Sequence, residues 1–327
     1  MVALYVVSSE EAAGRTTVCA GLGKLLQGNG KKVGYLKPVI AERGGDDGDA
    51  AFMKQLLGLS EAVASLSLQA DDPEKIKKAY DRVSQGKDVI IVEGRLGQSA
   101  EDALTQATYK VAKALEAKVM VVEAYSGQAS RFIDSYKGFG KSLLGVVLNK
   151  VPKSQLKRVQ DEASKQFSAV GISFLGVLPE DRVLFAITVG EMADSIKGKI
   201  LNNAEKSAEL VENFMLGAMV VDSGLDYFGR KSNKAAVVRG DRPDMQLAAL
   251  ETSTRCLVLS GSNQPPIYNV LQKAENRGIP VISSGNTTSN IVTIIEDALS
   301  QGRFNQEKKL PKLAEIMKQH LNLKAVL

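Results

Sequence analysis

The sequence predicts an α/β protein built from two consecutive parallel-sheet domains, the second smaller than the first. Short runs of β-branched residues alternate with amphipathic stretches along the chain, as expected for repeated βαβ units. The runs 89–92 and 119–122 are apolar at every position, which predicts strands covered by helices on both faces of a sheet. With 327 residues, the chain is long enough for two domains, each with its own core.

The first array of strands extends to residue 181. Its strands are expected, in order, at residues 4–7, 32–39, 88–94, 118–124, 142–151 and 174–181, with amphipathic segments between them. A polar, lysine-rich stretch at 195–209 then indicates a boundary. We therefore assign the first domain to residues 1–197.

The second array repeats the pattern on a smaller scale. Strands are expected at 234–238, 255–261 and 279–285, and helices at 243–251, 266–278 and 288–302. One more amphipathic helix follows at 313–323. We assign the second domain to residues 209–305 and a C-terminal tail helix to residues 306–327.

Composition argues against several classes of protein. No stretch approaches the ~20 apolar residues of a membrane span, and the net charge of +5 comes from basic residues interspersed with acids, so neither a membrane nor nucleic acid is an expected partner. The first residues are an apolar strand without the basic start of a signal peptide, so we expect a cytoplasmic protein. Cys19 and Cys256 lie in apolar segments, which predicts two reduced, buried thiols and no disulfide or structural metal.

A modified phosphate loop follows the first strand. In the motif G-x-x-x-x-G-K-[ST], backbone N–H groups surround the phosphates while the lysine and the hydroxyl serve charge and Mg²⁺. Here Ser9 replaces the first glycine and Arg15 replaces the lysine. We expect the residues at the start of the following helix to contact a phosphate group: Gly14, Arg15, Thr16 and Thr17.

These departures predict weakened chemistry. Glu10 and Glu11 place two negative charges beside the phosphates, and their repulsion should weaken binding. The guanidinium of Arg15 is positive but too broad for the lysine's place between the β- and γ-phosphates, so catalysis should suffer more than binding. The alternative is a strand-turn-helix junction retained only for packing.

Later segments resemble, in the same order, the dethiobiotin synthetase family and its relatives, the cobyrinic acid diamide synthetase ATPase domain and the N-terminal region of long phosphate acetyltransferases. The matching segments are residues 35–39, 48–50, 92–97, 147–151 and 175–179. Their shared order implies a P-loop NTPase-like sheet over about the first 185 residues.

The resemblance implies roles for particular side chains. Lys37 would be catalytic and face the substrate and phosphates, and Asp49 and Glu93 would join Thr16 as ligands of Mg²⁺. Beside the adenine the resemblance places two further residues, Asn149 and Lys150. The implied cofactor is ATP or another nucleotide with Mg²⁺.

Physical chemistry supports these positions independently of the resemblance. An open α/β sheet binds ligands at the carboxyl ends of its strands, and carboxylate oxygens suit Mg²⁺ held with phosphates. Structural explanations stay open: Lys37 as a solvated strand end, Asp49 as a helix N-cap and Glu93 as a turn acid. Arg95 and Leu96 fill a turn that the family leaves open for substrate, which predicts an altered substrate pocket.

The second half resembles the DRTGG domain, on residues 240–244, 247–251, 257–261 and 277–281. Pro243 and Asp244 replace part of the name-giving Thr-Gly-Gly. One interpretation is a structural corner, in which Asp241 caps the next helix and Pro243 begins it. The other is an anion site at the helix start, formed by Arg239, Gly240, Asp241 and Arg242, with residues 284–287 as a second lip. In the resembling proteins this domain is regulatory and helps form dimers, which implies a homo-oligomer, namely a dimer.

Two functions follow. The first is a regulatory protein that binds a nucleotide or metabolite without efficient ATP turnover. The second is an ATP- and Mg²⁺-dependent ligase that activates a carboxylate, as in dethiobiotin or cobyrinic acid diamide synthesis. A glutamine-dependent variant is disfavoured, because the single histidine, His320, has no fitting cysteine near it in the sequence.

Overall fold

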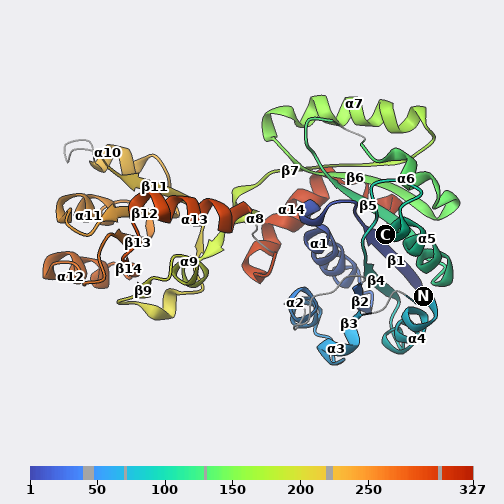
Figure 1. Cartoon of the computed structure of the whole chain (residues 1–327), viewed down its shortest axis with the longest axis horizontal. Coiled ribbons are helices and arrows are strands. Elements are labelled where there is room, and N and C mark those ends of the chain that lie inside the picture. The colour runs from blue at the N-terminus through green and yellow to red at the C-terminus, as the bar shows by residue number, and fades with distance from the viewer. Residues whose placement is uncertain (40–47, 70–71, 129–130, 219–223, 301–303, 327) are drawn as a thin grey trace. The chain divides into compact units, whose positions relative to one another are not determined.

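The structure is a computed structural model, and it describes residues 1–39, 48–69, 72–128, 131–218, 224–300 and 304–326. It divides into two compact units, Met1–Asp181 together with Phe304–Leu327, and Arg182–Arg303 (Figure 1). These bounds differ from the domain assignment made from the sequence. The polar stretch 195–209 belongs to the second unit, because it contributes a strand to that unit's sheet. The C-terminal helix belongs to the first unit.

The first unit contains a seven-stranded sheet with the order β3-β2-β4-β1-β5-β6-β7, in which all neighbouring strands are parallel. The predicted strands are all present, and the short β3 is an addition. The bounds are β1 Val2–Val7, β2 Val33–Val39, β3 Ser67–Gln69, β4 Val89–Glu93, β5 Lys118–Ala124, β6 Leu143–Val151 and β7 Phe174–Pro179.

Helices cover both faces of this sheet. Figure 1 shows α7 and the pair formed by α1 and α14 on opposite sides of it. Asp72 and Asp102 cap α4 and α5 by accepting from Glu74 N and Leu104 N. The bounds are α1 Arg15–Gly28, α2 Gly48–Leu57, α3 Val63–Leu66, α4 Pro73–Val83, α5 Ala103–Ala114, α6 Ile133–Lys137, α7 Leu156–Ala169 and α14 Leu310–His320.

The packing of α1 depends on small residues. A Cβ added at Gly21 would lie 2.0 Å from Met317 Sδ on α14, and one at Gly23 would lie 2.8 Å from a Leu57 methyl group on α2. Glycine at these positions therefore lets α1 approach both helices closely. Cys19 on the same helix is buried and unpaired, as predicted, and so is Cys256 in the second unit.

The second unit has a five-stranded sheet with the order β11-β12-β13-β14-β9. Only β9 is antiparallel to its neighbour within this described sheet. Its bounds are β9 Lys199–Ile200, β11 Asn213–Gly217, β12 Lys234–Arg239, β13 Thr254–Ser260 and β14 Val281–Ser284, and a separate two-stranded sheet pairs β8 Ile187–Thr188 with β10 Leu210–Val211.

Both faces of the second sheet are buried. One apolar cluster includes Phe228 and Leu257, and the other includes Met192 and Ile291. Figure 1 shows α10, α11 and α12 on one side of the sheet and α9 and α13 on the other. The helices are α8 Arg182–Phe185, α9 Val189–Ser195, α10 Gly224–Gly229, α11 Pro243–Leu250, α12 Tyr268–Asn276 and α13 Thr288–Ser300. The last two residues predicted for the helix at 288–302 lie outside the described residues.

These two units confirm the predicted fold class, a P-loop NTPase-like parallel sheet followed by a smaller α/β unit. Among the described helices, none combines the length and apolar character needed to cross a membrane.

Candidate functional site

The loop between β1 and α1 has the path of a phosphate loop. A short 3₁₀ turn, Glu11–Ala13, leads to Gly14, whose φ of 89° is in the left-handed region, and α1 begins at Arg15. Asn149 at the end of β6 donates from Nδ2 to the Ala13 carbonyl over 2.8 Å. A Cβ at Gly14 would lie 2.2 Å from that nitrogen. Gly14 and Asn149 therefore hold the loop against the end of the sheet.

Glu93, the last residue of β4, is the centre of the site. Its Oε1 accepts from the Thr16 hydroxyl and its Oε2 from the Tyr35 hydroxyl, each over 2.8 Å. The side chain is 2% exposed, and burial raises the pKa of the carboxyl while the charges of Arg15 and Lys37 partly offset the rise. Glu93 is thus a buried acceptor joined to the first turn of α1, and not only an acid of the turn.

Lys37 and Asp49 form the second part of the site. Lys37 Nζ lies 2.6 Å from Asp49 Oδ2, and both side chains are less than one-fifth exposed. Lys37 is therefore not a solvated strand end. The charges of both residues act on Glu93, so these predicted residues gather at the carboxyl edge of the sheet.

The donor set at this edge fits Mg²⁺ held with phosphates. Two carboxylates and a threonine hydroxyl are oxygen ligands, and Mg²⁺ usually combines one or two carboxylates with phosphate oxygens and water. Within the described part of the chain, no group of three or more His, Cys, Asp or Glu side chains could hold a metal ion.

Arg15 is directed toward the turn after β4. Its guanidinium donates to the Gly94 carbonyl over 2.8 Å, and Nε lies 4.0 Å from Glu93 Oε1. The side chain is 13% exposed. Thr17 follows Thr16 in the first turn of α1. The guanidinium that replaces the P-loop lysine is therefore already hydrogen-bonded to the protein backbone.

The acidic residues of the loop form ion pairs with arginines from elsewhere in the chain. Glu10 Oε2 lies 2.7 Å from an Arg131 guanidinium nitrogen, and Glu11 Oε1 lies 3.2 Å from one of Arg95. The sequence alone does not bring these arginines to the loop, and the expected repulsion of a phosphate by Glu10 and Glu11 stays a prediction. Arg95 follows β4 and Arg131 follows β5, the two strands on either side of β1.

The turn after β4 is filled, as predicted. Leu96 is 2% exposed and its N–H donates to the Ser8 carbonyl over 2.9 Å. Thr108 donates to the Arg95 carbonyl over 2.6 Å. At Gly94 a Cβ would lie 2.4 Å from the Tyr5 hydroxyl, so only glycine fits there.

Lys150, the last residue but one of β6, has a φ of 60°. Burial lowers the pKa of its ammonium group, and the charges of Glu180 and Glu10 oppose this change. The side chain is therefore close enough to Glu10 to share the loop's electrostatic field.

In the second unit, the predicted anion site is a corner of paired charges. Arg239 forms an ion pair with Asp241, and Arg242 pairs with Asp244 over 2.7 Å. Arg242 is the N-cap of α11, which has no side-chain cap. The expectation that Asp241 caps this helix is thus wrong, because its carboxylate bonds to Arg239 instead.

Close backbone packing shapes the same corner. A Cβ at Gly240 would lie 2.4 Å from the Ser262 Cβ. The buried Gln246 donates to the carbonyls of Arg239 and Gly240. In the expected second lip, the Ser284 hydroxyl donates to the Ile196 carbonyl, so this hydroxyl has a structural partner.

A family model for an AAA domain matches residues 2–188, more than half of the chain. The chain belongs to this AAA-domain family. A second model, for the DRTGG domain, matches residues 191–298. The inferred combination of a dethiobiotin synthetase-like P-loop domain with a DRTGG domain is confirmed.

Curated relatives agree with this combination. The phosphate acetyltransferase of Pseudomonas aeruginosa is 23% identical over 97% of this chain and 50% of its own length. That of Nitrosomonas europaea is 24% identical over 88% of this chain and 46% of its own. The chain thus spans about half the length of these relatives. The ATP-dependent dethiobiotin synthetase of Methanococcus vannielii is 25% identical over 55% of this chain and 94% of its own length.

One solved structure matches part of the chain at a low level of similarity. The CBS and DRTGG domains of the regulatory region of Clostridium perfringens pyrophosphatase, complexed with diadenosine tetraphosphate, are 17% identical and cover 41% of this chain and 55% of that one, with a TM-score of 0.31.

A buried polar group next to the AAA-domain loop was missed by the sequence analysis. Glu123 at the end of β5 is 2% exposed. Its Oε2, the Tyr136 hydroxyl and the Ser9 hydroxyl are buried without a hydrogen bond of regular geometry. Burial raises the pKa of Glu123 to about 7, and Tyr136 and Arg131 partly offset the rise. The sequence feature that could have revealed this residue is a glutamate inside an otherwise apolar strand.

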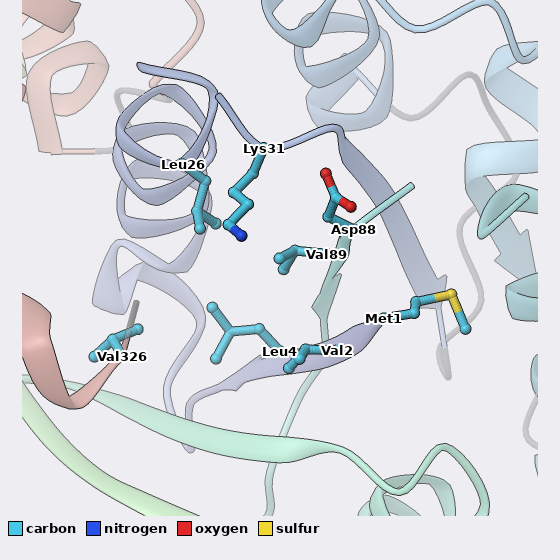
Figure 2. A pocket seen from close by; sticks show the side chains of 8 residues that line it. All are labelled: Met1, Val2, Leu4, Leu26, Lys31, Asp88, Val89 and Val326. Atoms are coloured by element: carbon cyan, nitrogen blue, oxygen red, sulfur yellow. The ribbon is translucent and has the colours of Figure 1, made fainter. Parts of the chain in front are cut away.

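A pocket of about 260 Å³ lies at the opposite edge of the AAA-domain sheet. Figure 2 shows its mainly apolar lining around Lys31 and Asp88. The lining comes from the starts of β1 and β4, from α1 and from Val326. It contains none of the predicted site residues and lies away from the carboxyl ends of the strands, where an α/β sheet binds its ligands.

Proposed function

We propose that this protein is a regulatory protein that binds a nucleotide or another phosphate-bearing metabolite at the carboxyl edge of its AAA-domain sheet, with little turnover of ATP. The chain is related to phosphate acetyltransferases over about half their length. The observation that carries the proposal is a loop that runs from β1 through a left-handed Gly14 into α1, and whose cation, Arg15, donates to the Gly94 carbonyl.

Binding is supported by the groups that surround the loop. The N–H groups at the start of α1 favour an anion. Thr16, Asp49 and Glu93 supply oxygen ligands for Mg²⁺. Lys37 adds a positive charge at the same edge of the sheet, where it can bind a phosphate oxygen.

Slow turnover is supported by the position of Arg15. Phosphoryl transfer depends on cations placed where negative charge develops between the leaving and transferred groups. An arginine held by the turn after β4 must break its hydrogen bond to Gly94 before it reaches a terminal phosphate. That requirement leaves ground-state binding possible while it lowers the rate of transfer.

The second unit is assigned the regulatory part of the proposal. A DRTGG-type unit with its own core follows the AAA domain. We propose that the chain acts as a homo-oligomer, in which this unit passes on the effect of ligand. Arg239 and Arg242 are candidates for a second anion site when their ion pairs with Asp241 and Asp244 open.

Thermal unfolding with increasing Mg·ATP, Mg·ADP or Mg·GTP tests the binding proposal. A ligand at one hundred times its dissociation constant should add ~2.7 kcal/mol of stability. Lys37→Ala and Asp49→Ala should abolish the shift. Lys77→Ala and Asp81→Ala are matched controls, because these residues form an exposed ion pair on α4, and they should leave it unchanged. The absence of any shift with the unsubstituted protein would contradict the proposal.

An ATP-dependent ligase is the second candidate. The juxtaposition of Thr16 with Glu93 and of Lys37 with Asp49 favours it, together with the similarity to the dethiobiotin synthetase. Measuring the release of ADP from Mg·ATP distinguishes the ligase from the regulatory protein. Sustained release that Lys37→Ala abolishes and Lys77→Ala does not would favour the ligase.

A further inference from the structure

The Glu10 carboxylate lies where a phosphate oxygen would be attracted. Its Oε2 is 2.7 Å from a guanidinium nitrogen of Arg131, and both side chains are only a little more than one-quarter exposed. A carboxylate is a planar oxygen anion and a phosphate is a tetrahedral one. The oxygens of both accept hydrogen bonds from a guanidinium.

Arg131 is positioned by contacts other than the one to Glu10. Its backbone N–H donates to Glu123 Oε1 over 3.3 Å, and its guanidinium lies 5.1 Å from the centre of the Phe132 ring. A guanidinium nitrogen is also 3.5 Å from the Ala124 carbonyl. The arginine is therefore held at the end of β5, next to β1, independently of the loop.

We propose that Arg131 forms an anion-binding subsite of the phosphate loop, and that the Glu10 carboxylate occupies this subsite when no phosphate is bound. The inference rests on the proposed function and names the residue that replaces the engaged Arg15. A phosphate group would displace the Glu10 carboxylate and accept hydrogen bonds from Arg131.

The energetics allow this exchange. A partly exposed carboxylate–guanidinium pair contributes on the order of 1 kcal/mol or less. A phosphate carries more negative charge and can accept two parallel N–H bonds from a guanidinium. Glu11 and Arg95 form a more exposed pair on the other side of the loop, with Glu11 78% exposed, so we assign the subsite to the less exposed pair.

Isothermal titration with Mg·ATP and with inorganic tripolyphosphate, at constant ionic strength, tests the subsite. Glu10→Gln should tighten binding about 3- to 10-fold, because the competing charge is removed. Arg131→Gln should weaken it about tenfold. Glu315→Gln and Arg82→Gln are matched controls on exposed helix faces, and they should change affinity by less than about twofold.

The double variant decides the mechanism. If Glu10 competes for Arg131, the gain from Glu10→Gln disappears when Arg131 is also replaced by Gln. A gain of equal size in both backgrounds would overturn the inference, because it would mean that Glu10 acts only by long-range repulsion. Unchanged affinity in Glu10→Gln would also overturn it.

Failure of the proposed function gives a different result. In that case neither probe binds to the unsubstituted protein or to Glu10→Gln, and both proposals fall. Glu10→Asp provides a second test with a conservative variant. The shorter side chain moves the carboxylate away from Arg131 by the length of one methylene group, so the affinity for both probes should be intermediate.

Discussion

At the scale of single residues, the site is defined by buried carboxylates and by one glycine with a left-handed backbone. Glu93 and Glu123 lie at the carboxyl ends of β4 and β5, the strands on either side of β1, but their surroundings differ. Glu93 accepts from two hydroxyl groups, whereas Glu123 Oε2 has no regular hydrogen bond. Because a buried carboxylate is costly to ionise, Glu123 should contribute to the pH dependence of stability.

Glu123→Gln should reduce the loss of stability between about pH 4.5 and 7. The pKa of Glu123 is raised from 4.5 to about 7 in the folded protein, so the folded state binds more protons than the unfolded state in this range. The free energy of unfolding therefore falls as pH rises, by at most on the order of 3 kcal/mol. The variant should lack this contribution, as measured by calorimetric midpoints at pH 5 and 8.

The exposed Glu162 on α7, paired with Arg158, provides a control for the same change. Glu162→Gln should retain the slope of the unsubstituted protein. A Glu123→Gln protein with an unaltered pH slope would show that this carboxyl is not the group that titrates with folding.

Gly14→Ala should destabilise the protein by about 2 kcal/mol or more. The alanine would adopt a left-handed φ at a cost of about 1 kcal/mol, and its Cβ would displace the Asn149 amide from the Ala13 carbonyl. Ligand-dependent stabilisation should be lost as well, because the loop moves. Denaturant unfolding and thermal shifts with Mg·ATP measure both effects.

Gly30→Ala separates the cost of the left-handed backbone from the cost of the lost contact between Asn149 and Ala13. Gly30 has a φ of 78°, but a Cβ there meets nothing within 4 Å. The Gly30→Ala protein should therefore lose only the stability that corresponds to the backbone cost, and it should still bind ligand. Equal losses in the two variants would mean that the contact between Gly14 and Asn149 contributes nothing.

At the scale of elements, α1 links the phosphate loop to a helix from the far end of the chain. Its first turn carries Thr16, and its middle packs against α14 and α2 through Gly21 and Gly23. The sequence analysis treated the C-terminal helix as a separate tail. Only the fold shows that this helix covers α1 and contacts β7, where Asn322 N donates to the Leu175 carbonyl.

Gly21→Ala should therefore destabilise the first unit, although alanine favours helices. The added Cβ would lie 2.0 Å from Met317 Sδ, and overpacking of this kind costs about 1–3 kcal/mol. Gly28→Ala on the same helix meets nothing within 4 Å and should be neutral or stabilising by up to about 1 kcal/mol. Thermal unfolding compares them. Met317→Ala should recover part of the loss in the Gly21→Ala protein, and no recovery would argue against this contact.

At the scale of the whole molecule, the chain consists of two units with separate cores. The first is closed by a segment that follows the second in sequence. Unfolding of the full chain is therefore expected to have more than one transition, and each stability change should be assigned to its own unit. The two family matches, to residues 2–188 and 191–298, follow the same division closely.

The sequence by itself determined the fold class, the strand order along the chain and the positions of Gly14, Thr16, Lys37, Asp49 and Glu93. Apolar runs and loop motifs are local patterns, and parallel strands bring their carboxyl ends to one edge. Only the tertiary structure decided that Arg15 bonds to Gly94, that Arg131 pairs with Glu10 and that the C-terminal helix packs on α1. These contacts join residues far apart in the chain, and no local pattern specifies which distant side chain lies within hydrogen-bonding distance.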